Sequence, residues 1–203
     1  MARWLQDAAY GDVLDAGLED GVWVVRRARV QVARLPALGE RVRLRTWCSG
    51  IGPRTAERRT TVRGDRGGEV DAVAVWAHLD PQTGAPARLG ERFAEVYGPS
   101  AGPERPDHRL RHPAPPDGAE RLPWTFRAAD IDIAGHVNNA VYWEALEEGT
   151  PVGDGAVVEA EHRAPAQAGP AYVVRDGPRT WVTSPAGDVH ASFALSESGS
   201  RGR

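Results

Sequence analysis

The stretch Ala129-Asp130-Ile131-Asp132-Ile133-Ala134-Gly135-His136-Val137-Asn138-Asn139-Ala140-Val141-Tyr142-Trp143 decides how this chain is interpreted. It brings carboxylates, an imidazole and two amides together between a predicted strand at 124–127 and a predicted helix at 140–148. A helix N-terminus exposes unpaired backbone N–H groups and the positive end of a dipole. Such groups can polarise a carbonyl and stabilise the oxyanion that forms when the carbonyl is attacked.

Two kinds of interpretation are open for these residues. On the chemical interpretation, Asp132 activates a water or attacks directly, and Gly135 lets the backbone approach a ligand closely. On the plainer one, Asn138 or Asn139 is a helix N-cap, His136 is a buried histidine without a role, and Asp132 is a turn residue. The combination of these residue types, after a strand and at the start of a helix, favours the chemical interpretation.

Outward from this stretch, the same order of elements is predicted twice. Period-two alternation predicts strands after the helix around 156–163, 171–175, 180–183 and 189–195. In the first half, an amphipathic helix at 4–18 precedes strands around 23–32, 42–47, 55–62 and 70–79. The residues between the halves are rich in proline and show no core pattern, as expected of a stiff, extended connector.

Short words also recur in both halves. RLPALG at 34–39 resembles RAPAQAG at 163–169 with one residue inserted, and GEVDA at 68–72 resembles GDVHA at 187–191. Either match alone can arise by chance. Their shared order, together with the repeated helix-then-strands pattern, favours an internal duplication.

Bulk composition excludes several classes of function. The 203 residues are 41% hydrophobic and 26% charged, which is typical of globular chains, and the net charge of −3 argues against nucleic-acid binding through bulk charge. All 25 basic residues are arginine, so no lysine amine is present for Schiff-base chemistry. No apolar run approaches the roughly 20 residues of a membrane span. The lone Cys48 and the lack of a signal-peptide pattern predict a cytoplasmic location.

The pattern Asp-x-x-Gly-His-Val-Asn-Asn-x-x-Tyr, at 132–142, resembles the signature of hot-dog-fold thioesterases, in which an antiparallel sheet wraps a long central helix. Apart from its ends, the whole chain resembles the acyl-carrier-protein (acyl-ACP) thioesterases, which carry two such units in tandem. The words WLQDAA at 4–9, WVVRR at 23–27 and WAHLD at 76–80 are also similar to that family. The resemblance implies an α+β fold, a tandem (double) hot-dog.

That resemblance also implies a domain organisation. It gives an N-terminal unit at 1–98 whose first strand is absent from this sequence, a Pro-rich linker at 99–120, a C-terminal unit with the catalytic loop at 121–196, and a disordered tail at 197–203. Because the first unit lacks the matching loop, a structural role or a lipid pocket is expected there.

Carried over onto this sequence, the resemblance implies a set of site residues. It assigns Asp132, His136, Asn138 and Asn139 to catalysis, backbone groups at Gly135 and Val137 to the oxyanion, and Tyr142 and Trp143 to substrate binding. Three positions depart from the family pattern: Ala134 replaces an asparagine, and Pro165 and Ala166 replace a glutamate and a cysteine of plant members. Glu159 and Glu161 lie nearby and leave the glutamate alignment open. Asp-x-x-Gly also resembles the loop of single-unit hot-dog thioesterases, whose aspartate is the key carboxylate.

The expected reaction is hydrolysis of an acyl-ACP thioester to the free acid, without a metal or an organic cofactor. The alternatives are a coenzyme A thioester as substrate, or a degenerate hot-dog protein that only binds an acyl chain. Ala134 and Pro165 motivate the second alternative. The carrier-borne thioester is the expected partner, with a second copy of the chain, in a homodimer, as a further candidate.

Overall fold

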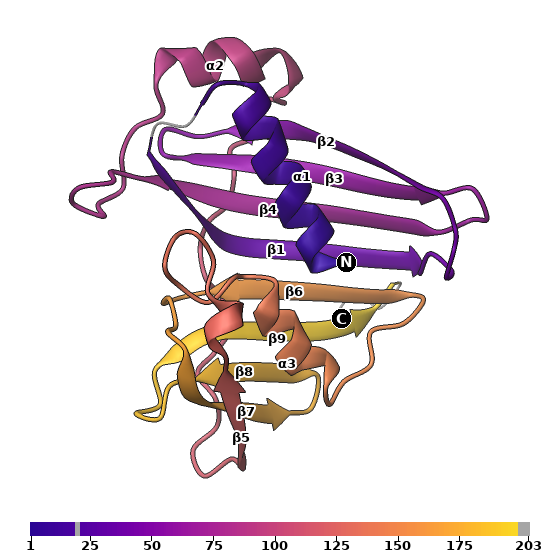
Figure 1. Ribbon diagram of the computed structural model, residues 1–203, viewed down its shortest axis with the longest axis vertical. Coiled ribbons are helices and arrows are strands. Elements are labelled where there is room, and N and C mark those ends of the chain that lie inside the picture. Colours follow the sequence, from indigo (N-terminus) through magenta and orange to yellow (C-terminus); the bar gives the residue numbers. More distant parts are fainter. Residues whose placement is uncertain (19–20, 199–203) are drawn as a thin grey trace.

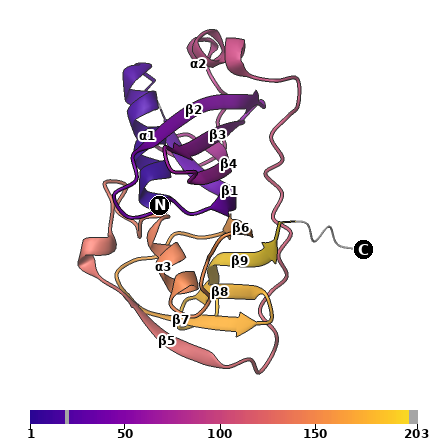
Figure 2. The ribbon, with the colours of Figure 1, turned by 90° about the vertical axis from the view of Figure 1, so that its right-hand side faces the viewer.

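The computed structural model describes residues 1–18 and 21–198 of the 203. Within them, nine strands form one sheet in the order β2-β3-β4-β1-β6-β9-β8-β7-β5, and α1 and α3 lie on the same face of it (Figure 1, Figure 2). The elements are α1 (Ala2–Asp15), β1 (Val22–Arg34), β2 (Val42–Ile51), β3 (Thr55–Gly64), β4 (Glu69–Leu79), α2 (Glu91–Tyr97), η1 (Gly98–Ser100), β5 (Arg121–Phe126), η2 (Ala128–Asp130), α3 (Val141–Glu147), β6 (Ala156–His162), β7 (Gly169–Asp176), β8 (Arg179–Thr183) and β9 (Val189–Glu197).

The two halves of the chain repeat one arrangement. Helix α1 is followed by β1 to β4, and α3 is followed by β6 to β9. In each half the strand after the helix pairs antiparallel with the last strand, β1 with β4 and β6 with β9. The repeated words of the sequence fall at equivalent places: one follows the first strand after the helix, and the other leads into the last strand. The duplication expected from the sequence therefore has a structural counterpart.

Strands β1 and β6 join the two units into one sheet. They pair antiparallel, with Arg27 opposite Glu161 and Ala28 opposite Ala160. Because successive side chains of a strand point to opposite faces, this register places the two alanines together under the helices. It places Arg27 and Glu161 together on the outer face of the sheet.

Helix α1 departs from its predicted extent. It spans Ala2–Asp15 instead of 4–18, because Gly17, with a φ of +63°, adopts the left-handed conformation that ends helices. Trp4 and Leu14, which the sequence pattern places on the apolar face, are 49% and 41% exposed. The helix covers the sheet from one side only, so these two positions lie on its flanks.

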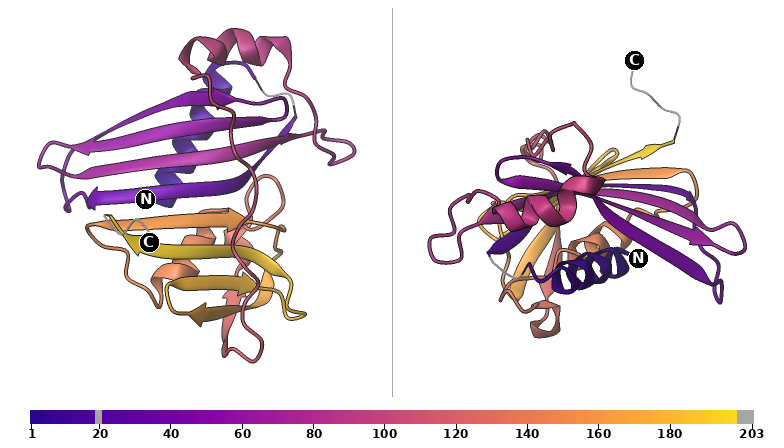
Figure 3. Two further views of the ribbon diagram at one scale, coloured as in Figure 1. Left: turned by 180° about the vertical axis from the view of Figure 1, so that it is seen from behind. Right: turned by 90° about the horizontal axis from the view of Figure 1, so that it is seen from above.

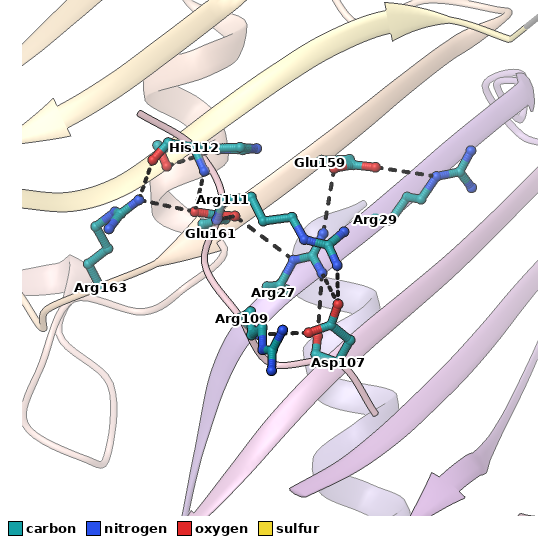
Figure 4. A network of polar contacts seen from close by, with 10 residues as sticks. Arg27, Arg29, Asp107, Arg109, Arg111, His112, Glu159, Glu161 and Arg163 are labelled. Atoms are coloured by element: carbon teal, nitrogen blue, oxygen red, sulfur yellow. Dashed lines mark hydrogen bonds and ion pairs between the residues drawn. The ribbon is translucent and has the colours of Figure 1, made fainter. Parts of the chain in front are cut away.

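The Pro-rich linker crosses the outer face of the sheet, opposite the helices, over the junction of the two units (Figure 2, Figure 3). Glu161, which is 1% exposed, holds it there, since its carboxylate accepts the backbone N–H groups of Arg111 and His112. The same carboxylate pairs with Arg27 at 3.9 Å and with Arg163 at 3.2 Å (Figure 4). The linker therefore ties the two units together from behind.

The sequence pattern does not predict helix α2, which the structure contains. It follows β4 and buries Phe93 and Tyr97, and Phe93 stacks on Trp23 with ring centroids 5.2 Å apart. At the other end of the chain, β9 runs to Glu197, inside the tail predicted at 197–203. Residues 199–203 of that tail lie outside the described residues. None of the described helices is both long and apolar enough to cross a membrane.

Candidate active site

Most of the predicted site residues lie on the loop between η2 and α3. Its backbone forms a tight turn, in which the Asp132 N–H donates to the His136 carbonyl at 2.9 Å and the Gly135 N–H donates to the Asp132 carbonyl at 3.0 Å. Gly135 has a φ of +77°, a conformation that glycine adopts without strain. The glycine in the sequence motif is thus explained by the turn that presents Asp132 and His136.

Both sides of this loop are anchored to buried backbone. The Val137 N–H donates to the Ala166 carbonyl at 2.9 Å, and the Asn138 N–H donates to the Asp130 carbonyl at 2.9 Å. Asp130 is 4% exposed and forms an ion pair with Arg127 at 2.7 Å. Hydrogen bonding from the Arg127 side chain lowers the pKa of the Asp130 carboxyl. Asp130 therefore stabilises the loop from below, a role that the sequence analysis did not assign to it.

These bonds involve the N–H groups that were assigned to the oxyanion. The N–H groups of Gly135 and Val137, both assigned to the oxyanion, already donate within the protein, and so does that of Asn138. Of the N–H groups at 137–139, only that of Asn139 has no hydrogen-bond partner within 1–18 and 21–198. The physical reason is that α3 begins only at Val141, so the preceding N–H groups serve to anchor the loop.

The structure does not make Asn138 or Asn139 the N-cap of α3, because Ala140 holds that position and no side chain within the described residues caps the helix, but Asn138 has a structural role of another kind. Its side-chain Oδ1 accepts the Ala140 N–H at 2.9 Å, directly before α3, and its carbonyl accepts the Val141 N–H at 2.9 Å. Both contacts shape the entry into the helix, although Ala140 rather than Asn138 is the N-cap residue itself. Asn138 thus has a structural task, whereas the Asn139 side chain has no hydrogen-bond partner among the described residues.

Asp132 combines a turn contact with an available oxygen. It is half-buried, and its Oδ1 accepts the Ala134 N–H at 2.9 Å. Its Oδ2 has no hydrogen-bond partner in the described part of the chain. Within that part no hydrogen bond joins the side chains of Asp132 and His136, so the two residues are linked through their backbones alone.

The two aromatic residues at the start of α3 face different surroundings. Tyr142 is 2% exposed and packs edge-to-face against Phe126 and His162, with ring centroids 5.2 and 5.6 Å apart. Burial raises the pKa of Tyr142 to about 12, and the nearby charge of Asp132 adds to this. Tyr142 belongs to the core of the second unit, whereas Trp143 lines a cavity.

This cavity, of about 70 Å³, lies between the two helices and the sheet. Small side chains at Ala28, Ala72 and Ala74 form part of its floor and leave the space beneath the helices. Its wall near the loop is formed by Asn139, Ala140, Trp143 and His162. The cavity therefore connects the end of the predicted catalytic loop with the sheet of the first unit.

His162 lines the cavity, a position that the sequence analysis did not assign to it. It is 8% exposed, and burial lowers the pKa of its imidazole to about 4, with a further contribution from the charge of Arg26. It has no hydrogen-bond partner within the described residues, so a neutral, unpaired imidazole lines the cavity. A lone histidine at an inward position of the predicted strand at 156–163 was the available signal.

The two glutamates that the sequence analysis left open, Glu159 and Glu161, lie on the face of the sheet opposite the cavity. Glu159 and Glu161 lie on the outer face of β6 and contact arginines and the linker (Figure 4). His162 and Ala160 alternate with them and face the helices. Both glutamates therefore point away from the face of the sheet that carries the helices and the cavity.

Two family models match this chain. The acyl-ACP thioesterase N-terminal domain matches residues 7–97, and the acyl-ACP thioesterase C-terminal domain matches residues 114–159, which together make up well over half of the chain. The chain belongs to the acyl-ACP thioesterase family.

Solved structures of this family share its double hot-dog fold. An acyl-ACP thioesterase from Bacteroides thetaiotaomicron matches with a TM-score of 0.79 at 19% identity, covering 96% of this chain and 87% of that one. The 12:0-ACP thioesterase from Umbellularia californica matches with a TM-score of 0.74 at 19% identity, covering 96% and 88%.

Sequence relatives of this acyl-ACP thioesterase family member are distant. An uncharacterized protein of Mycobacterium tuberculosis is 26% identical over 150 residues, which make up 73% of this chain and 60% of that protein. The palmitoyl-acyl carrier protein thioesterase of Arabidopsis thaliana is 29% identical over 170 residues, 73% of this chain and 41% of that protein. The chain thus spans about 60% of the length of its mycobacterial relative and less of the plant enzyme.

Proposed function

We propose that this protein hydrolyses an acyl thioester carried on acyl carrier protein and releases the free acid. The proposal rests on one observation above the others. A chain of this family keeps the Asp132 loop, folded into a tight turn, next to a cavity whose wall includes Asn139. The family membership supports the reaction class, and the cavity provides space for an acyl group.

In the proposed mechanism, the thioester carbonyl lies against the backbone N–H of Asn139, the group at 137–139 that is free to donate. The available oxygen of Asp132 accepts a proton from a water molecule, and the water oxygen attacks the carbonyl carbon. Collapse of the tetrahedral intermediate breaks the C–S bond, and the departing thiolate takes up a proton. A variant of this route has Asp132 attack directly, giving a mixed anhydride that water then hydrolyses.

His136 acts in this scheme by orienting the substrate or the loop. No hydrogen bond joins its side chain to Asp132 in the described part of the chain, which makes direct proton relay between the two the less favoured role. The side chain of Asn139 is a second candidate donor to the carbonyl. Asn138 contributes by holding the entry of α3.

The test is thiol release from matched acyl-ACP and acyl-coenzyme A thioesters. Asp132→Asn should lose about 10²–10⁴-fold in kcat, as is typical when a positioned acid–base group is removed. Asp176→Asn, at an exposed strand end, is the matched control and should retain full turnover. Turnover that survives in Asp132→Asn would place the chemistry elsewhere. A wild-type protein that binds acyl groups without turnover would indicate the binding-only alternative.

A further inference from the structure

We propose that His162 is a further catalytic residue, whose imidazole N–H donates to the carbonyl oxygen of the thioester and stabilises the oxyanion beside the backbone N–H of Asn139. This inference rests on the proposed function, because it adds a group to the same carbonyl site. His162 lies outside the catalytic-loop motif, at the end of β6.

The backbone of the catalytic loop offers few donors to an oxyanion. The N–H groups of Gly135, Val137 and Asn138 donate to carbonyls of the protein, and within the described residues only that of Asn139 is without an acceptor. Oxyanion sites combine preorganised donors from the backbone and from side chains, histidine included. A second donor for this carbonyl should therefore come from a side chain on the cavity wall beside Asn139.

His162 lies on that wall, close to the catalytic loop. It lines the cavity together with Asn139. Four residues after it, the Ala166 carbonyl accepts the Val137 N–H at 2.9 Å, so the segment that leaves β6 is bonded to the catalytic loop. The ring of Tyr142, at the start of α3, packs against His162 with ring centroids 5.6 Å apart. The imidazole is thus held between the sheet and the helix that follows the loop.

The ring nitrogens of His162 are available to a ligand. The residue is 8% exposed and has no hydrogen-bond partner within residues 1–18 and 21–198. In that part of the chain, Nε1 of Trp76 and Nε1 of Trp124 are fully buried without a partner, whereas neither nitrogen of His162 is. The His162 nitrogens therefore keep accessible surface where the residue lines the cavity. An enclosed donor without a partner favours a ligand atom that accepts from it.

The charges around His162 suit an oxygen that becomes anionic. Burial lowers its pKa to about 4, with a contribution from Arg26, so at neutral pH the ring is uncharged and one nitrogen carries a hydrogen. A neutral imidazole can polarise a carbonyl in this way. Arg26 has no ion pair among the described residues, and the carboxylate of Glu161 is shared with Arg27 and Arg163 on the outer face. Negative charge on the carbonyl oxygen would thus meet a donor and a nearby guanidinium.

The reaction leaves His162 unchanged. As the water oxygen bonds to the carbonyl carbon, the water proton passes to Asp132 and the carbonyl electron pair moves to the oxygen, which accepts from His162 and Asn139. Collapse re-forms the carbonyl, the C–S bond breaks, and the thiolate takes up the proton from Asp132. The imidazole donates a hydrogen bond throughout and transfers no proton.

Binding of ketone analogues tests the donor without requiring turnover. The probes are butyryl-, octanoyl- and dodecanoyl-pantetheine analogues in which CH₂ replaces the sulfur, each paired with a counterpart that has CH₂ in place of the carbonyl. By calorimetry, the full-length protein should bind a ketone about tenfold more tightly than its counterpart, the effect of one well-placed hydrogen bond. Infrared spectra of the bound, carbon-13-labelled ketone report how strongly its carbonyl is polarised.

Two variants and a control assign the effect. His162→Phe removes the donor and keeps a ring, so kcat for thioester hydrolysis should fall about 10²–10³-fold, the usual effect of losing one oxyanion donor, with little change in KM. The carbonyl stretch of the bound ketone should also shift to higher frequency. His162→Gln restores a side-chain N–H and should recover part of both effects. His108→Phe, at an exposed position of the linker, should behave as wild type.

Nitrogen-15 NMR of the wild type with labelled histidine needs no variant. One histidine should keep the signals of a neutral ring at about pH 5, since its pKa is well below the ordinary value. Its N–H signal should shift when a ketone binds and stay unchanged with the counterpart. If no histidine responds in this way, the proposal is overturned even where both variants misfold.

The outcomes also separate this inference from the proposed function. Hydrolysis that is unchanged in His162→Phe overturns the inference and leaves the proposed function standing. Lost activity with an unaltered carbonyl frequency assigns His162 a structural role only, and lack of binding of every ketone likewise overturns the inference. Ketone preference that depends on His162, in a wild type that hydrolyses no thioester, supports the hydrogen bond and refutes the proposed activity.

Discussion

Removing the carboxylate of Glu161 should loosen the linker at Arg111 and His112 and destabilise the protein. Hydrogen bonds to charged groups contribute about 1.5–3 kcal/mol each, and removing one partner of a buried ion pair costs about 3–5 kcal/mol. Arg27 keeps Glu159 and Asp107 as partners, and Arg163 keeps the His112 carbonyl. For Glu161→Ala we therefore expect the lower end of that range, a loss of about 3 kcal/mol in the free energy of unfolding.

Urea denaturation measures this loss directly. With a slope of about 3 kcal/mol per molar urea, the unfolding midpoint of Glu161→Ala should fall by about 1 M. Glu159→Ala is the matched control, two residues away on the same strand and face. Its carboxylate contacts Arg27 and Arg29 at 3.7 and 3.9 Å with the side chain 44% exposed, so screening limits its effect to under about 1 kcal/mol.

Hydrogen exchange supplies the local readout. The amides of Arg111 and His112 donate to Glu161, so their protection should disappear in Glu161→Ala and persist in Glu159→Ala. Equal midpoint shifts in the two variants would refute the view that burial of Glu161, rather than the presence of a negative charge, holds the linker in place.

Two further predictions concern buried charge. In the folded protein the pKa of His162 is about 4, below its ordinary value of about 6.5. Between these two pH values the unfolded chain binds more protons than the folded protein. The free energy of unfolding should therefore fall as the pH drops through this window, by roughly 3 kcal/mol in total. In His162→Phe this share of the pH dependence should vanish from denaturation curves recorded at pH 7 and pH 4; unchanged pH dependence would contradict the burial argument. Asp12→Ala leaves the guanidinium of Arg58 without its carboxylate and should lower the unfolding free energy by roughly 2–4 kcal/mol. Asp15→Ala, exposed on the same helix, should change it by less than about 0.5 kcal/mol, and similar losses in both variants would argue against the ion pair.

The positions of the strands along the chain were accessible from the sequence because one face of the sheet is buried, whereas their order in the sheet, with β1 beside β4, was not. Alternation marked the strands of both units, and the repeated words lie after the first strand and at the start of the last strand of each unit. Helix α2 escaped because it has only seven residues, too few to show a helical period. The extent of α1 was misjudged, since the effect of Gly17 depends on its left-handed conformation rather than on residue type alone.

The local fold of the motif was predictable, whereas the acceptors of its backbone N–H groups were not. The motif at 132–142 located the loop correctly as a turn before a helix. The Val137 N–H, however, bonds to Ala166, a partner 29 positions along the chain that no local pattern reveals. The cavity is likewise formed by residues that lie far apart in the sequence. Arg58, Trp76 and His162 come from three different strands, and the pairings of β3 with β4, β4 with β1 and β1 with β6 bring them to one space.

The junction of β1 with β6 also governs how this chain can change in evolution. A deletion or insertion of a single residue within either strand would invert one strand's faces relative to the other. Ala28 on the cavity floor would then exchange places with Arg27, or Ala160 in the core of the second unit with Glu161, so that a charge would enter the space under the helices. Substitutions can therefore accumulate along this seam, but changes of length are confined to the loops at its ends.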